Sequence, residues 1–217
     1  MAPKHTIKLW YFGIRGRGEP IRMLLKLAGV EFEDVRIEME QWPTLKEETP
    51  FGQVPVLEVD GVKIAQSNAI MRYLGREYGF AGATNLEDAQ LDMVADLFYD
   101  ASKAEGITGW PRMLLGAIPF PDGLSKTDYF KQRVSPALDK YAGMFEAFLL
   151  EHIADPLWNG DKITWVDVMA AEFFGRFVEY GEPDALEAFP HILQLIARVQ
   201  ALPQIREHIE QRPKTGF

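Results

Sequence analysis

A predicted β-hairpin around residue 60 constrains the fold of this chain more than any other feature. Two apolar runs, VPVLEV (54–59) and VKIA (62–65), flank Asp60-Gly61, a pair that favours two-residue hairpin turns. Pro55 stands at the start of the first run, where a strand tolerates proline because the ring has no N–H to donate. Both runs are therefore expected to be neighbouring antiparallel strands of one sheet.

Helix and strand patterns surround the hairpin. The segment EPIRMLLKLAG has apolar residues on one helical face, a proline in its first turn and a glycine at its end. After the hairpin, Ser67 is expected to cap a helix that ends at Gly79. This order of elements is typical of an α/β unit. The predicted order is strand, helix, strand, hairpin and helix, over residues 6–12, 19–29, 35–39, 54–65 and 67–78.

The rest of the chain has no convincing strand and is predicted to be helical. A capping box, Thr164 with Asp167, begins one helix, and a loop rich in proline and glycine covers residues 116–123. Charge changes at the same boundary, because residues 1–82 carry 11 basic and 11 acidic side chains, whereas residues 83–217 carry 12 and 21. We therefore expect an α/β domain over 1–82 and an all-helical domain over 83–217. The amphipathic segments of the second domain are 86–117, 126–152, 164–179, 189–201 and 203–212.

Composition argues against several classes of function. The net charge of −9 disfavours nucleic acids and anionic membranes as partners. No apolar run is long enough to span a membrane, and the first residues lack the apolar core of a signal peptide, so a cytoplasmic protein is expected. The chain has no cysteine, which excludes disulfides and a cysteine nucleophile. Any thiol in its chemistry must come from a ligand.

Gln66 and Ser67 form a polar pair directly after the hairpin, and the pair has two interpretations. Ser67 can cap its own helix, or the helix start can bind a ligand carboxylate beside the Gln66 amide. The Val54–Pro55 bond leaves two interpretations as well: a plain turn, or a cis bond that turns the Val54 backbone outward to pair with a short peptide. The second interpretation of each feature describes a site for an amino-acid-like ligand.

Several short motifs follow one another over the first third of the chain. They are YF (11–12), RGRGEP (15–20), EQWPTLK (40–46), PFGQVPVLEVDG (50–61) and QSNAIMRYL (66–74). In this order they resemble the cytosolic glutathione transferases, specifically the sigma-like group, and the similarity extends to the closing RPKTGF. Each motif is weak, but their order and spacing are specific. The resemblance implies an α/β thioredoxin-like domain with a mixed sheet, followed by an all-α domain.

The resemblance implies that Tyr11 and Arg17 are catalytic. In the family, a tyrosine hydroxyl at the end of the first strand donates to the sulfur of glutathione, and an arginine supports the thiolate electrostatically. The thiolate is the nucleophile, whereas a free thiol with a pKa of roughly 8.5 is mostly protonated at neutral pH. One charge-assisted hydrogen bond, worth about 1.5–3 kcal/mol, would lower that pKa by roughly one to two units. Without the resemblance, Tyr11 would be read as a packed aromatic and Arg17 as a solvated charge.

The resemblance also implies how glutathione, the co-substrate, is bound. Trp42 and Lys46 would hold the glycine carboxylate, since an indole N–H and an ammonium both suit it. Asp100 would reach the γ-glutamyl amine from a second subunit, which implies a homodimer. Gln53 replaces a lysine that is common in the family, which removes one charge. The full implied set is Tyr11, Trp42, Lys46, Gln53, Val54, Pro55, Gln66, Ser67 and Asp100.

Asp100 belongs to a column of acids, with Asp92 and Asp96, at four-residue spacing. The column can be a solvated acidic face, a contact for a partner subunit, or a divalent-cation site as in prostaglandin D synthase. In that enzyme the motif has two adjacent acids, and Tyr99 replaces one of them here. The four histidines are scattered without ligand spacing, so no metal is expected.

The function expected from this resemblance is the addition of glutathione to small apolar electrophiles. The alternatives are a glutathione-dependent isomerase that makes prostaglandin D, and a non-catalytic binding or structural relative such as a lens crystallin. Conjugation is expected to exceed isomerisation, because of Tyr99 and the divergent segment 103–123. The expected electrophile pocket consists of Phe12, Ile14, Ile107, Trp110 and Phe217.

Overall fold

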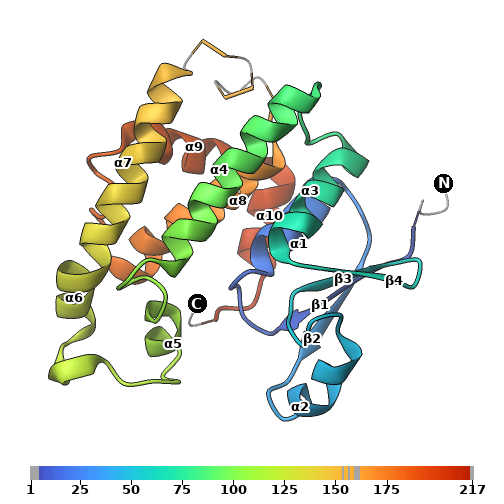
Figure 1. Ribbon diagram of the computed structural model, residues 1–217, viewed down its shortest axis with the longest axis horizontal. Coiled ribbons are helices and arrows are strands. Elements are labelled where there is room, and N and C mark those ends of the chain that lie inside the picture. The colour runs from blue at the N-terminus through green and yellow to red at the C-terminus, as the bar shows by residue number, and fades with distance from the viewer. Residues whose placement is uncertain (1–4, 153, 156, 159–161, 216–217) are drawn as a thin grey trace. The chain divides into compact units, whose positions relative to one another are not determined.

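The computed structural model describes residues 5–152, 154–155, 157–158 and 162–215, and Figure 1 shows its elements. Two compact units are present. The first contains the chain up to Phe80 together with Leu202–Thr215, and the second contains Ala81–Ala201. The last helix of the chain therefore belongs to the first unit, although its sequence was expected to continue the helical domain.

The first unit contains a four-stranded mixed sheet in the order β2-β1-β3-β4. β1 (Ile7–Phe12) pairs with β2 (Glu33–Ile37) in parallel and with β3 (Val56–Val59) antiparallel, and β3 pairs with β4 (Val62–Ala65) antiparallel. The predicted mixed α/β sheet is confirmed, and β2 begins two residues before the predicted segment.

The predicted hairpin turn is also confirmed. Asp60 and Gly61 have φ angles of +49° and +86°, and positive φ at both central residues is what a type I′ turn requires. The Asp60 carboxylate accepts hydrogen bonds from the Thr6 backbone N–H at 2.8 Å and from the His5 ring at 2.6 Å. These bonds attach the turn to the residues that precede β1.

The helices of the first unit pack around α1 (Glu19–Leu27), which contacts both α3 (Ser67–Tyr78) and α10 (Pro203–Gln211). α1 ends as predicted, with Gly29 at a φ of +65° just beyond it. A short helix, α2 (Trp42–Leu45), continues into the 3₁₀ turn η1 (Lys46–Glu48). The apolar core of this unit includes Leu9, Ile21, Leu24, Leu57, Ile70 and Leu74, each with no exposed surface.

The second unit is helical in the part that the structure describes, which confirms the predicted class. Its elements are α4 (Asn85–Lys103), α5 (Trp110–Leu114), η2 (Pro121–Gly123), α6 (Lys126–Tyr129), η3 (Phe130–Val134), α7 (Ser135–Glu151), α8 (Trp165–Arg176), η4 (Phe177–Gly181) and α9 (Pro190–Ala201). No helix among the described residues has the length and apolar character that crossing a membrane would require.

The amphipathic segment 86–117 is not one continuous helix, because the chain turns at Gly106 between α4 and α5. This residue has a φ of +88°, and a side chain there would overlap the backbone of Arg133. The Tyr129 hydroxyl donates a hydrogen bond to the Gly106 carbonyl at 3.2 Å. The close approach of Gly106 to the segment around Arg133 therefore separates α4 from α5. The hydrophobic periodicity of residues 86–117 carries no information about that distant contact.

The predicted capping box at the start of α8 is confirmed and is buried. Thr164 and Asp167 exchange the two bonds of the motif, and the Asp167 carboxylate also accepts a hydrogen bond from Arg198 of α9 at 3.0 Å. Asp167 is only 1% exposed, so its charge depends on these partners. The cap therefore joins α8 to α9 as well as starting α8.

Asp167→Ala is expected to destabilise the fold by about 3–5 kcal/mol, because it removes one partner of a buried ion pair together with the cap. Asp128→Ala is the control, because Asp128 occupies the same helical position in α6 and is exposed there, and its carboxylate accepts from the Ser125 hydroxyl and from no backbone N–H among the described residues. It is expected to cost no more than about 1 kcal/mol. Chemical denaturation followed by circular dichroism measures both, and equal losses would contradict the role of Arg198.

Candidate functional site

The predicted glutathione-site residues that belong to the first unit lie at one edge of its sheet, whereas Asp100 belongs to the second unit. The register pairs Trp10 with Val56, and Val56 with Ala65. The end of β1, the start of β3 and the end of β4 therefore lie at the same edge. β2 runs parallel to β1, so it also ends there, before α2 begins. This register gathers Tyr11, Trp42, Pro55 and Gln66 from separate parts of the chain.

Tyr11 is held tightly by the loop that follows β1. Its side chain is 7% exposed, and its hydroxyl oxygen accepts a hydrogen bond from the Arg17 backbone N–H at 2.9 Å. A Cβ at Gly16 would overlap the Tyr11 hydroxyl, and one at Gly18 would overlap its ring. Both glycines are therefore required for the loop to close over Tyr11. The hydroxyl proton has no acceptor among the described residues, so it can be donated to a ligand.

The two arginines of this loop have different environments. Arg17 is exposed, with its backbone N–H bonded to Tyr11, whereas Arg15 is buried at 5% exposure. The family resemblance implies a role for Arg17 and none for Arg15. Spacing in a glycine-rich loop does not show which of two arginines is buried, so the burial of Arg15 was not predicted.

The start of α3 differs from its prediction, because Gln66 occupies the N-cap position and Ser67 is the first helical residue. Gln66 is exposed and has φ +74° and ψ +117°, with no hydrogen bond from its side chain to the helix. A residue other than glycine in such a conformation stores about 1–3 kcal/mol of strain. The simple capping interpretation of Ser67 is therefore wrong, and the first N–H groups of α3 lie outside the helix's own hydrogen-bond ladder.

Trp42 and Lys46 come from the short helical segment after β2. The Trp42 side chain is half-buried, and the Phe12 ring packs edge-on against it at 5.4 Å between centroids. Lys46 is exposed, and its side chain passes over Gly52, where a Cβ would lie 3.1 Å from the Lys46 Cε. These contacts attach α2 both to the end of β1 and to the loop before β3.

In the segment before β3, the sequence left the isomer of the Val54–Pro55 bond open. In the structure this bond is cis. Gln53 is exposed, Val54 is half-buried and Pro55 is buried at the start of the sheet.

The second unit contributes less clearly to the predicted site. Ile107 and Trp110 are 5% and 1% exposed, and Trp110 stacks on Phe177 at 5.3 Å, so both are core residues of that unit. Phe217 lies outside the described residues. Phe12 and Ile14, from the first unit, are half-buried, and the Phe12 ring centroid lies 5.8 Å from that of Tyr11.

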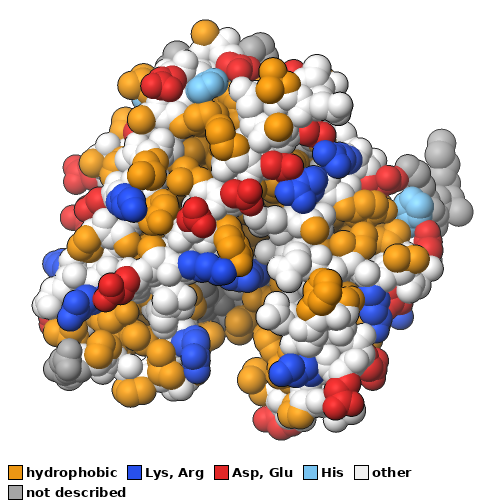
Figure 2. Space-filling view, in the orientation of Figure 1, with side chains coloured by type: hydrophobic (Ala, Val, Ile, Leu, Met, Phe, Trp, Pro, Cys, Tyr) orange, Lys and Arg blue, Asp and Glu red, His pale blue; other side chains and the backbone are white. Residues whose placement is uncertain are grey.

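Acidic side chains follow the surface of α4 in Figure 2. Asp96 and Asp100 are exposed and Asp92 is half-buried. Within the described part of the chain, no group of three or more acids and histidines is arranged to hold a metal ion. Asp96 and Asp100 therefore lie on the exposed side of α4.

Glu19, at the start of α1, is a buried carboxylate that was not among the predicted site residues. It is 2% exposed, and its Oε1 accepts hydrogen bonds from His208 and Arg212 of α10, both at 2.9 Å. Burial alone would raise the pKa of Glu19, but the hydrogen bonds and charges of His208 and Arg212 outweigh it and lower the pKa from 4.5 to about 2. In the sequence, Glu19 belongs to the RGRGEP motif and begins the α1 segment, where an acidic residue is common, so no local pattern indicated its burial.

This lowered pKa predicts a pH-dependent contribution to stability. The pKa of Glu19 is lower in the folded protein than in the unfolded one. The ionised carboxylate therefore contributes its full stabilisation of the fold above pH 4.5, and this stabilisation is lost as the pH falls to about 2. Glu19→Gln should therefore be less stable than the wild type at pH 7 by about 3 kcal/mol, and the difference should shrink over that range. Urea denaturation at a series of pH values measures it.

Glu210→Gln is the control for this experiment, because Glu210 is an exposed carboxylate on α10. It should change stability by no more than about 0.5 kcal/mol at any pH. A Glu19→Gln difference that stays constant from pH 7 to pH 2 would refute the assigned pKa.

Comparison with known proteins gives consistent matches over nearly the whole chain. Family models described as the N-terminal and C-terminal domains of glutathione S-transferase match residues 7–76 and 117–212. A probable glutathione S-transferase of Caenorhabditis elegans is 49% identical over 96% of this chain and 97% of its own length. The hematopoietic prostaglandin D synthase of Gallus gallus is 38% identical over 97% and 98%. A solved structure, monomeric Na-GST-3 of Necator americanus, has a TM-score of 0.88 and 36% identity, covering 98% of this chain and 100% of that one.

Proposed function

Because the chain belongs to the glutathione S-transferase family, we propose that it stabilises the thiolate of glutathione through Tyr11 and adds it to apolar electrophiles. The family uses glutathione as co-substrate, and the chain has no cysteine of its own, so the reacting thiol is that of glutathione. The proposal includes membership of the sigma-like group and a detoxifying role in the cytoplasm.

The observation that carries this proposal is the setting of the Tyr11 hydroxyl. Its oxygen accepts from the Arg17 N–H at 2.9 Å, which orients the hydroxyl, and its proton has no acceptor among the residues described. A sulfur atom placed at that proton would receive a charge-assisted hydrogen bond when it ionises. Such a bond is worth about 1.5–3 kcal/mol, which lowers a thiol pKa by roughly one to two units.

The residues at the same sheet edge suit the two charged ends of glutathione. Trp42 and Lys46 offer an indole N–H and an ammonium to the glycine carboxylate. At the other end, the N–H groups that begin α3 and the strained Gln66 suit the γ-glutamyl carboxylate. Gln53, Val54 and Pro55 lie between these positions in the chain, and we assign them to the peptide backbone of glutathione.

For the apolar electrophile, Phe12 and Ile14 are the side chains we assign. They are half-buried, belong to the loop that holds Tyr11, and so lie next to the reacting sulfur in this proposal. Ile107 and Trp110 pack in the core of the second unit, so a lining role for them would need the core to open.

Conjugation is favoured over prostaglandin isomerisation by the relatives. The chain is 49% identical to a protein named as a glutathione S-transferase and 38% identical to one named as a prostaglandin D synthase. A cation site like that of prostaglandin D synthase would need a second acid at position 99, where this chain has tyrosine. Tyr99 is 41% exposed, and the Lys103 ammonium lies 4.1 Å from its ring centroid. A cation beside this ring would disfavour a bound metal ion.

Tyr11→Phe is expected to raise the pKa of enzyme-bound glutathione by roughly one to two units, because the ring remains while the hydrogen bond to sulfur is lost. Conjugation of a model aromatic electrophile, measured against pH, should shift by the same amount. Ultraviolet absorbance of the bound thiolate measures the ionisation directly.

Tyr129→Phe is the matched control for the loss of a hydroxyl group. The Tyr129 hydroxyl is bonded to the Gly106 carbonyl in the second unit, so its removal should lower stability by about 1 kcal/mol and leave the thiol pKa unchanged. A Tyr11→Phe protein with an unchanged thiol pKa would remove Tyr11 from the mechanism. No conjugation by the wild type would favour a non-catalytic binding protein.

We further propose a homodimer in which Asp100 of the partner subunit binds the ammonium of the γ-glutamyl group. Asp100 is exposed on α4, as this role requires. Large apolar side chains are also exposed, among them Phe51 at 68%, Met93 at 53% and Leu86 at 73%, and such side chains suit burial in an interface. The structural relative Na-GST-3 is monomeric, so the mass of this chain in solution is a direct test of the proposed dimer.

Asp100→Ala should weaken glutathione binding about tenfold, which is less than a fully buried charge pair would lose because the site is partly hydrated. Calorimetry measures the affinity, and light scattering measures the mass of the same sample. Asp96→Ala, one turn earlier on the same exposed face, should leave the affinity unchanged. A dimer that binds glutathione equally well without Asp100 would contradict this role, as would a monomer.

A further inference from the structure

Arg22 is the most deeply buried cation of the first unit among its described residues. It lies in the second turn of α1 and is 1% exposed, among apolar neighbours such as Ile21, Leu24 and Leu25. Burying a guanidinium is expensive unless each of its donors finds a partner. The identity of those partners indicates what the residue does.

Two of its donors bind the loop that holds Tyr11. Nη1 donates to the Ile14 carbonyl at 2.9 Å, and Nη2 donates to the Phe12 carbonyl at 3.2 Å. These two carbonyls stand on either side of Gly13, directly after the strand end. The Arg22 guanidinium carbon also lies 5.8 Å from the centroid of the Tyr11 ring. Arg22 therefore contacts the backbone on both sides of Gly13 and the ring of Tyr11 itself.

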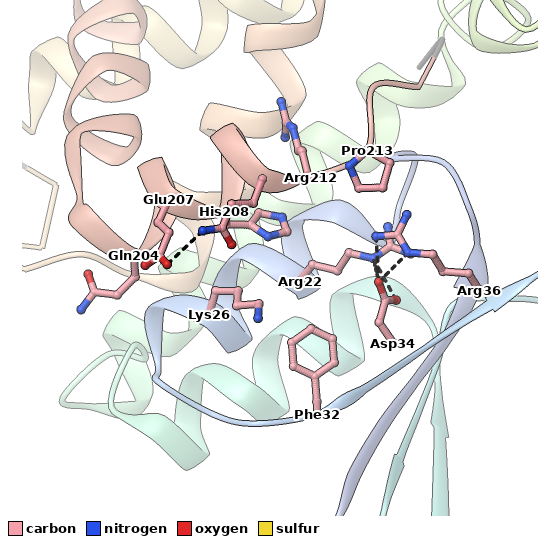
Figure 3. Close-up of a pocket in the computed structure, with 11 residues that line it drawn as sticks. Arg22, Lys26, Phe32, Asp34, Arg36, Gln204, Glu207, His208, Arg212 and Pro213 are labelled. Atoms are coloured by element: carbon pink, nitrogen blue, oxygen red, sulfur yellow. Dashed lines mark hydrogen bonds and ion pairs between the residues drawn. The ribbon is translucent and has the colours of Figure 1, made fainter.

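The other donors hold Arg22 in place. Nε donates to both Asp34 oxygens at 3.0 and 3.1 Å, and Figure 3 shows Asp34 between Arg22 and Arg36. Nη1 also lies 3.4 Å from Glu19 Oε2. Glu19 is in turn bound by His208 and Arg212 of α10. The network borders a hollow of about 370 Å³ between α1, β2 and α10.

We propose that Arg22 is a positioning residue for catalysis, which holds the Phe12–Arg17 loop so that the Tyr11 hydroxyl is aimed at the sulfur of glutathione. This inference rests on the proposed function of Tyr11. Arg22 itself touches no reacting atom. It acts through the two loop carbonyls, and α10 supports it through Glu19.

Only an arginine can make this set of contacts. Its planar guanidinium presents five donors in fixed directions, so Nε can bind Asp34 while Nη1 and Nη2 bind two carbonyls. A lysine would keep the charge but has one nitrogen, which cannot reach all three partners. A buried ion pair is also weak evidence for stability, because apolar side chains often replace one without loss. Positioning of the loop explains why the Arg22 charge is buried on α1, beside the end of β1.

The experiment is a double-mutant cycle of Arg22→Lys and Tyr11→Phe, with the pKa of bound glutathione as the readout. Arg22→Lys alone should raise that pKa and lower kcat/KM about tenfold, since small displacements of a catalytic group carry losses of this size. In the Tyr11→Phe background, Arg22→Lys should cause no further change in the pKa. A positioning residue has no effect once the group that it positions is absent.

Arg36→Lys is the matched control. Arg36 shares the Asp34 carboxylate with Arg22, at 2.8 Å, but its described contacts include no carbonyl of the Tyr11 loop. It should change kcat/KM by less than about twofold and leave the thiol pKa unchanged. If Arg22→Lys fails to fold, Asp34→Asn takes its place in the cycle, because it weakens the charge-assisted bonds that orient Arg22 and should shift the pKa in the same direction.

The outcomes separate this inference from the proposed function. A folded Arg22→Lys protein with a wild-type thiol pKa overturns the positioning role, and so does a shift that simply adds to that of Tyr11→Phe. Equal effects of Arg36→Lys and Arg22→Lys would also overturn it. If Tyr11→Phe itself leaves the pKa unchanged, the proposed function fails, and the positioning role fails with it.

Discussion

The register of the sheet in the first unit is the constraint on which the candidate site depends. β1 pairs with β2 in parallel and with β3 antiparallel, and β3 continues into β4 through a two-residue turn. With these directions, the ends of β1, β2 and β4 and the start of β3 share one edge of the sheet. Since a slip of one residue would turn every side chain to the other face, the buried alternation along β1 maintains that arrangement.

Close backbone contacts and buried ion pairs then shape the site at this edge of the sheet. Gly16 and Gly18 let the loop close over Tyr11, while Arg22 contacts the same loop through the carbonyls of Phe12 and Ile14. Behind the loop, Arg22 pairs with Glu19, and Glu19 pairs in turn with His208 and Arg212 of α10. The last helix of the chain is thereby part of the support for the first loop, although the two are far apart in sequence.

Some elements could be predicted because their signals are local. The Asp60-Gly61 turn and the Thr164–Asp167 capping box depend on the φ preferences and side-chain reach of neighbouring residues, and both are confirmed. Other predictions needed a distant contact. The break between α4 and α5 depends on the approach of Gly106 to Arg133, and the strained N-cap at Gln66 is not a conformation that local preferences favour. Periodicity and capping rules could find neither.

Residue order and composition alone predict the α/β unit followed by helices, exclude thiol chemistry by this chain and carry the family resemblance of the ordered motifs. The packing of α10 on α1, the place of Trp110 in the core and the joint burial of Glu19 and Arg22 could be seen only in the folded chain. Burial and ion pairing depend on all the surroundings of a side chain, which local sequence does not contain. Glu19 is separated from Arg212 by most of the chain, and only folding brings their charges to 2.9 Å.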